Sequence, residues 1–200
     1  MPLQNRVQPD GSIIAHPARG ALMGNRGILH DDHKTLGRQR WRHKAWVTCV
    51  LSFKGRKRRL MTPHAYTELF FLDEAVAFAA GHRPCGECRR ADFNRFRDAA
   101  GIAGRIADYD RNLHSARAEA RTYRQIRHTA EIGDLPDGIF VLDETGATCL
   151  VQGDALIPYS DMRYGAPISR PKTGRFTVLT PAPLVEVLRA GYRLSYPPAI

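Results

Sequence analysis

The spacing of apolar residues changes along the chain, and each change predicts a different element. Residues 45–53 (AWVTCVLSF) are apolar, aromatic or β-branched, which is typical of a strand. Gly55 follows within a basic turn, and a second short run lies at residues 59–62. The pattern therefore predicts a β-hairpin over residues 45–62 with an arginine-rich tip.

Three helices are expected in the middle of the chain. Asp73 is a good cap for the first, which is rich in alanine and ends before Gly81. The second carries Phe93 and Phe96 three residues apart, on the apolar face of an amphipathic helix. Residues 113–130 place apolar side chains on one stripe among several arginines, which predicts a basic surface helix.

Beyond Pro136 the apolar period changes to two, the period of strands. Residues 139–143 and 147–151 predict a hairpin, and residues 175–179 predict a further strand. A last helix is expected over residues 180–191, with Thr180 as its cap and a glycine at its end. Because strands and helices are grouped rather than strictly alternating, we predict an α+β fold.

Composition is that of an ordinary globular protein, with 43% hydrophobic and 25% charged residues in a chain of 200. No apolar run approaches the roughly 20 residues that span a bilayer, and no secretory signal is visible at the start of the sequence. We therefore expect a cytoplasmic protein that does not enter a membrane. The sequence sets no oligomeric state.

The formal charge of +10 is concentrated in residues 34–127, which carry a net +12. Arginine outnumbers lysine there, and its planar guanidinium suits bidentate contacts with phosphate. These features favour a nucleic acid as partner over an acidic protein, a membrane surface or a merely solvated face. Between the nucleic acids, we expect DNA rather than RNA. The candidate phosphate contacts are Arg56, Lys57, Arg58, Arg59, Arg83, Arg89, Arg90, Arg117, Arg121 and Arg124.

Cys85 and Cys88 are separated by two residues, a spacing that lets one tight turn point both sulfurs at one ion. Four cysteines are too few for a disulfide scaffold, and soft thiolates favour Zn²⁺. The alternatives are a redox pair and two unmodified thiols. A thioredoxin-type pair needs a helix that starts at its first cysteine, whereas here a helix ending in glycine is expected before it.

Residues 70–88 (FFLDEAVAFAAGHRPCGEC) resemble the second half of the zinc-binding N-terminal module of the Ada DNA repair family. The likeness comprises two aromatic residues, the capped alanine-rich helix, and the order Arg83, Pro84, Cys85 and Cys88. In that family two further cysteines lie upstream, and one of the four zinc ligands accepts a methyl group from a DNA phosphate. Here Lys54 and Arg58 occupy those two positions, so the reactive thiolate that the resemblance implies has no counterpart.

A zinc site in this chain must therefore take its remaining ligands from elsewhere. Cys49 and His64 are the nearest candidates, and with Cys85 and Cys88 they would make a Cys₃His set for a structural Zn²⁺. The alternatives are that Cys49 faces the core as a small apolar residue and that His64 is an ordinary surface histidine.

A binding module is the favoured function: a zinc-stabilised protein that grips nucleic-acid phosphates with its arginines, with no catalytic residue assigned. One alternative is an enzyme acting on DNA, either an alkyl-accepting repair protein or a nuclease that holds a divalent ion at residues 30–33 (HDDH). A second is a zinc-stabilised adaptor for an acidic protein. We expect a basic Ada-like region over residues 1–130 and a β-rich part over residues 131–200, packed as one unit.

Overall fold

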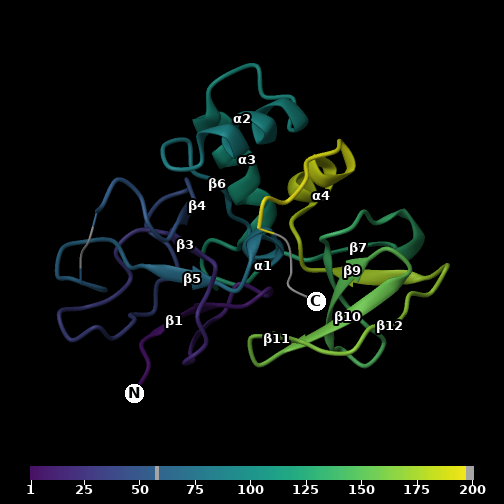
Figure 1. Ribbon diagram of the computed structural model, residues 1–200, viewed down its shortest axis with the longest axis horizontal. Coiled ribbons are helices and arrows are strands. Elements are labelled where there is room, and N and C mark those ends of the chain that lie inside the picture. The colour runs from purple at the N-terminus through teal and green to yellow at the C-terminus, as the bar shows by residue number, and fades with distance from the viewer. Residues whose placement is uncertain (57–58, 197–200) are drawn as a thin grey trace.

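The computed structural model describes residues 1–56 and 59–196, and its strands form two sheets (Figure 1). The first sheet has the strand order β2-β1-β5-β3-β4-β6. The pairs β1–β5 and β4–β6 are parallel, and the other neighbours are antiparallel. The strands are β1 (Gln4–Val7), β2 (Ile13–Ala15), β3 (Leu22–Asn25), β4 (Val47–Val50), β5 (Leu69–Phe71) and β6 (Arg83–Pro84).

The second sheet is antiparallel and comes from the last third of the chain. Its strand order is β11-β10-β9-β8-β13-β7, and β12 also pairs with β10. The strands are β7 (His128–Glu131), β8 (Phe140–Leu142), β9 (Thr148–Gln152), β10 (Ala155–Ser160), β11 (Arg163–Tyr164), β12 (Ile168–Ser169) and β13 (Arg175–Val178).

Helix α1 lies between the two sheets, and the other three helices gather on one side of the molecule (Figure 1). Every residue of α1 is buried, as expected for a helix enclosed on all sides. Phe78 packs in a cluster with residues of the second sheet, whereas Val76 and the alanines belong to a cluster with residues of both sheets. The helices are α1 (Glu74–Ala79), α2 (Arg90–Ala99), α3 (Ile106–Arg117) and α4 (Ala182–Arg189), with a short 3₁₀ turn at Ile132–Asp134.

The α+β prediction is confirmed, and the local signals explain most of its elements. Asp73 caps α1 by accepting a hydrogen bond from the Val76 amide at 2.9 Å, and Gly81 follows the helix with a φ of +81°. Phe93 and Phe96 are the buried side chains of α2. The hairpin β8–β9, the strand β13 and the helix α4 also lie where the sequence predicts them.

Three predicted details are wrong. Strand β4 pairs with β3 and β6 instead of forming a hairpin with residues 59–62. Four described residues with positive φ angles turn the chain after β4: Lys54, Gly55, Met61 and His64. Helix α3 ends at Arg117 instead of continuing to residue 130, since Ala118 is already extended. Thr180 does not cap α4; its hydroxyl accepts a hydrogen bond from the Phe140 amide instead.

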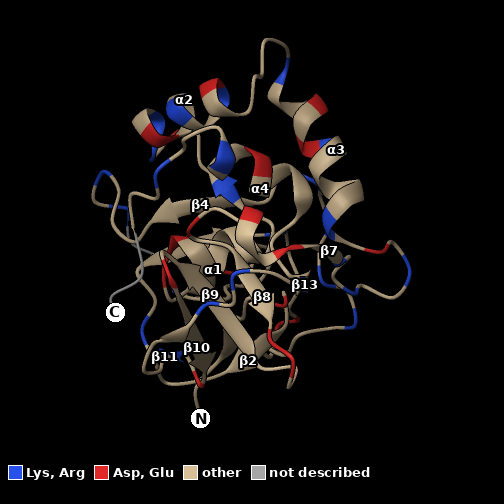
Figure 2. Ribbon diagram, turned by 90° about the vertical axis from the view of Figure 1, so that its right-hand side faces the viewer, with Lys and Arg blue, Asp and Glu red and all other residues tan. Residues whose placement is uncertain are grey.

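The charges of α2 and α3 are partly balanced within each of these two helices. Figure 2 shows basic and acidic segments alternating along α2 and α3, and ion pairs three residues apart join Arg95 to Asp92 and Arg111 to Asp108. None of the described helices is long and apolar enough to cross a membrane.

Candidate metal centre and adjoining groove

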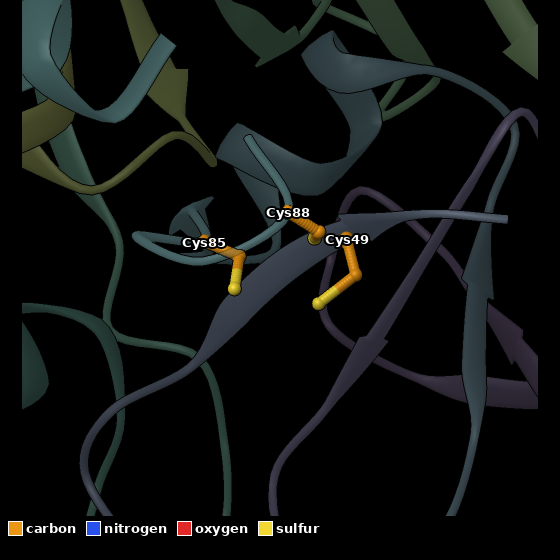
Figure 3. A group of neighbouring side chains, drawn as sticks. All are labelled: Cys49, Cys85 and Cys88. Carbon is orange, nitrogen blue, oxygen red and sulfur yellow. The ribbon is translucent and has the colours of Figure 1, made fainter. Parts of the chain in front are cut away.

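Three cysteines from two parts of the chain meet beside the first sheet (Figure 3). Cys49 lies on β4, and Cys85 and Cys88 lie on the turn between β6 and α2. The parallel pairing of β4 with β6 brings these segments together, and the Cys85 amide donates a hydrogen bond to the Thr48 carbonyl at 2.9 Å. The three sulfurs lie within 4.8 Å of one another. Three cysteines at this spacing could hold a metal ion.

The three thiols of the cluster differ in their pKa values. A hydrogen bond from the Cys49 thiol lowers the pKa of Cys85 to about 5, and the Glu87 amide also donates to the Cys85 sulfur, at 3.4 Å. The same thiol contact, followed by burial, raises the pKa of Cys49. Burial raises the pKa of Cys88. One sulfur is therefore favoured as a thiolate, and a cation bound here would displace the remaining protons.

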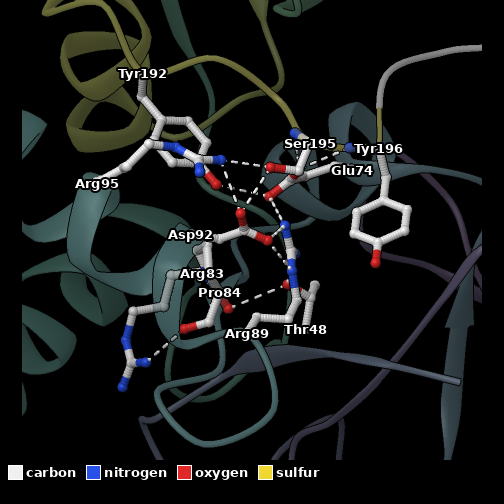
Figure 4. Close-up of polar contacts among 10 residues, drawn as sticks. All are labelled: Thr48, Glu74, Arg83, Pro84, Arg89, Asp92, Arg95, Tyr192, Ser195 and Tyr196. Atoms are coloured by element: carbon white, nitrogen blue, oxygen red, sulfur yellow. Dashed lines mark hydrogen bonds and ion pairs between the residues drawn. The ribbon is translucent and has the colours of Figure 1, made fainter. Parts of the chain in front are cut away.

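Arg89, which directly follows the second cysteine of the turn, ties this turn to its surroundings (Figure 4). It is 3% exposed. Its guanidinium donates to the Thr48 hydroxyl at 2.8 Å, to Glu74 at 2.7 Å and to Asp92 at 2.8 Å. Since Thr48 precedes Cys49, these bonds fix the turn against the strand that carries the third sulfur.

Glu74 extends this network to the end of the described chain. Its carboxylate is fully buried and accepts hydrogen bonds from the Tyr192 hydroxyl at 2.9 Å and the Ser195 amide at 2.7 Å. A buried carboxylate is stable only when it is paired and hydrogen-bonded. The buried ion pair of Glu74 and Arg89 thus links the first sheet, α1, α2 and the C-terminal segment.

A groove of about 840 Å³ opens beside the cysteines, and all three of them line it. Arg6, Arg19 and Arg56 supply positive charge, and the guanidinium of Arg6 lies 5.0 Å from the centroid of the Phe70 ring. Arg56 forms an exposed ion pair with Glu87 at 2.7 Å. The remaining lining includes the aromatic residues Phe53, Tyr66 and Phe70. Glu68 and Glu87 also line the groove, which therefore combines thiols, guanidinium groups, carboxylates and aromatic rings.

His64 is not part of the cysteine group. It is exposed, with a φ of +63°, and within the described residues only Cys49, Cys85 and Cys88 form a group of three or more potential ligands. The structure thus brings together three of the four predicted ligands. Three protein ligands with an open fourth position are typical of zinc sites that also bind water or a substrate.

Three of the predicted phosphate contacts are buried and have internal partners. Arg83 forms a bidentate pair with Asp110 at 2.6 and 2.7 Å, and Arg89 pairs with Glu74. Arg117 donates to backbone carbonyls. A run of charges in the sequence does not reveal which side chains face inward. The other predicted phosphate contacts that the structure describes are exposed: Arg56, Arg59, Arg90, Arg121 and Arg124. Lys57 and Arg58 lie outside the described residues.

Residues 30–33 do not form a metal group within the described chain. His30 is buried, and its Nδ1 lies 2.6 Å from the Thr67 hydroxyl. Asp31 accepts hydrogen bonds from the amides of His33 and Thr35, both at 2.9 Å, and so closes a turn. The four residues therefore point to different surroundings.

Sequence reasoning missed Arg6 and Arg19 as groove residues. Both lie in the turn-rich first 27 residues, where no spacing links them to the cysteines. Comparison with known proteins gave no match: no family model, no curated protein and no solved structure matches this chain. The resemblance to the Ada zinc module thus stays a prediction that rests on residues 70–88.

Proposed function

We propose that Cys49, Cys85 and Cys88 bind Zn²⁺ and that the protein is a zinc-stabilised nucleic-acid-binding protein. The observation that carries this proposal is the gathering of three sulfurs at the wall of a groove with three arginines. Thiolate ligands favour Zn²⁺ over hard cations such as Mg²⁺. The ion would join β4 to the turn before α2 and so stabilise this side of the first sheet.

The groove offers a nucleic-acid strand both guanidinium groups and aromatic rings. Guanidinium groups of Arg6, Arg19 and Arg56 offer contacts to phosphates, and aromatic rings offer stacking surfaces to bases. The net charge of +10 attracts a polyanion from a distance. We favour DNA as the partner, as the resemblance of residues 70–88 implies.

We expect binding to DNA oligonucleotides to weaken steeply with salt. If about four phosphates are neutralised, the affinity should fall roughly 100-fold between 50 and 200 mM salt. Arg56→Gln should reduce the slope of log K against log salt by about 1. Fluorescence anisotropy with single- and double-stranded oligonucleotides of equal length measures both quantities.

Lys172→Gln is the matched control for Arg56→Gln. Lys172 is an exposed cation in the second sheet's region, paired with Asp154, and it does not line the groove. The Lys172→Gln variant loses the same charge as Arg56→Gln, but away from the groove, so the slope of log K against log salt should stay that of the wild type. An affinity that is insensitive to salt, or equal losses in both variants, would contradict phosphate binding at the groove.

A second candidate function is alkyl transfer to one of the cysteines, since all three sulfurs border the groove. In such a reaction a thiolate attacks the methyl carbon of a phosphotriester, an S–CH₃ bond forms, and the C–O bond breaks to leave a phosphodiester anion. Incubation with methylated DNA should then raise the protein mass by about 14 Da, one methyl group in place of a proton. An unchanged mass would contradict alkyl transfer and leave nucleic-acid binding as the proposed function.

A further inference from the structure

A second pocket, of about 560 Å³, shares no lining residue with the groove beside the cysteines. It lies where residues 10–12, the start of β4 and the loop after α3 meet. Asp10 is the acidic side chain among its lining residues, whereas five are arginines: Arg26, Arg40, Arg117, Arg124 and Arg127. The lining also includes the aromatic residues Trp41, Trp46 and Tyr123. The pocket therefore has a large excess of positive charge.

Two of these arginines are buried, each with only 2% of its surface exposed. Arg26 donates to His82 Nε2 at 3.3 Å and to the Gly11 carbonyl at 3.2 Å, and its Nη2 has no hydrogen-bond partner among the described residues. Arg117 donates to the carbonyls of Gly81 and Lys44. All of these acceptors are neutral, so none of the bonds compensates a charge.

A buried cation without a counter-charge is unfavourable. Burial, together with repulsion from Arg40, lowers the pKa of Arg26 to about 9. Burial and repulsion from Arg26 also lower the pKa of Arg117 well below its usual value. An anion in the pocket would relieve both effects, because the nearby carboxylates of Asp10 and Asp110 offset them only in part.

The aromatic residues give the pocket a second recognition element. The guanidinium carbons of Arg26 and Arg117 lie 4.2 and 3.9 Å from the centroid of the Trp46 ring. Trp41 is half-buried, and its ring centroid lies 4.7 Å from that of Tyr123. A planar ring of a ligand can stack on Trp41 or Tyr123, as bases do on aromatic platforms, whereas Trp46 is 3% exposed.

The loop that forms one wall is held in place. Gln125 Nε2 donates to the carbonyls of Pro9 and Ala79, both at 2.9 Å, and the Ile126 amide donates to the Arg117 carbonyl at 3.0 Å. Tyr123 has a φ of +60°, a conformation that is unfavourable for an aromatic residue and is stable only where its surroundings enforce it. These contacts fix the position of the loop that forms this wall of the pocket.

We propose that this pocket binds a nucleotide, with its phosphate at the arginines and its base against Trp41 and Tyr123. The nucleotide is either free or one unit of a single strand, since both present the same phosphate and base. Nothing in this pocket depends on the cysteines. The proposal can therefore hold or fail independently of the zinc site and of the groove.

Intrinsic fluorescence tests the proposal directly, because the chain has two tryptophans and both line the pocket. Titration with adenosine monophosphate should change the emission in a saturable way and raise the melting temperature. Two partial ligands should each bind at least about tenfold more weakly than adenosine monophosphate. They are adenosine, which lacks the phosphate, and inorganic phosphate, which lacks the base. A thymidine hexanucleotide that binds more tightly than thymidine monophosphate would identify a strand as the natural source; equal affinity would identify a free nucleotide.

Variants at the exposed rim avoid disturbing the buried arginines. Arg124→Gln and Arg127→Gln should each weaken the binding of adenosine monophosphate about three- to tenfold. Arg121→Gln is the control, since Arg121 is an exposed arginine of the same loop that does not line the pocket. No saturable change in emission or melting temperature, or the same loss with Arg121→Gln, would overturn the proposal.

Discussion

We expect Arg89→Met to lower the free energy of unfolding by about 3–5 kcal/mol, the usual cost of removing one partner of a buried ion pair. The variant leaves the Glu74 carboxylate fully buried, with hydrogen bonds from Tyr192 and Ser195 but without its cation. It also removes the bond that fixes Thr48 beside the cysteines. Urea unfolding followed by circular dichroism measures the loss.

Arg90→Met is the matched control, because Arg90 is the next residue along the chain and is exposed. Its cost should stay within about 0.5 kcal/mol. Adding Glu74→Gln to Arg89→Met should recover part of the lost stability, since a neutral amide replaces the uncompensated charge. Equal losses in Arg89→Met and Arg90→Met, or no recovery in the double variant, would show that the buried charge is not the cause.

Removal of the metal is expected to lower the melting temperature by about 8–16 °C. A ligand present at about 1,000 times its Kd stabilises a protein by about 4 kcal/mol, and each kcal/mol corresponds to about 2–4 °C for a domain of this size. Differential scanning fluorimetry with the zinc-loaded protein, before and after a chelator, measures this shift.

Cys49→Ser provides the control for the chelation experiment. This variant should melt at the temperature of the chelated wild type, and the chelator should change it no further, because one of the three ligands is already missing. Re-addition of zinc should restore the wild type alone. If neither chelator nor zinc changes the melting temperature of the wild type, the result would contradict a stabilising metal.

The elements that the sequence predicts correctly are those fixed by neighbouring residues. Asp73 and Gly81 bound α1 through a cap and a positive φ, both of which are local. The two-residue spacing of Cys85 and Cys88 is equally local. Cys49 could be nominated as a further ligand because it is one of the nearest remaining candidates along the chain, and the structure does bring it to the pair.

The errors concern partners that are distant in sequence. The apolar run around Cys49 indicates a strand but does not reveal that β3 and the two-residue β6 are its neighbours. Arginines of one charge run are divided by tertiary packing into buried residues, such as Arg83 and Arg117, and exposed ones, such as Arg121. The pocket around Arg26 joins residues that lie more than 100 positions apart, which no sequence window contains.

Metal content, measured by elemental analysis, tests the central claim most directly. The purified wild type, reconstituted with zinc and freed of excess, should carry about one zinc per chain, and Cys49→Ser and Cys85→Ser should each carry almost none. Cys149→Ser should retain it, since Cys149 is buried in the core cluster of the second sheet, outside the group of Cys49, Cys85 and Cys88. A wild type that stays metal-free with its thiols reduced, or zinc that persists in both ligand variants, would contradict the account.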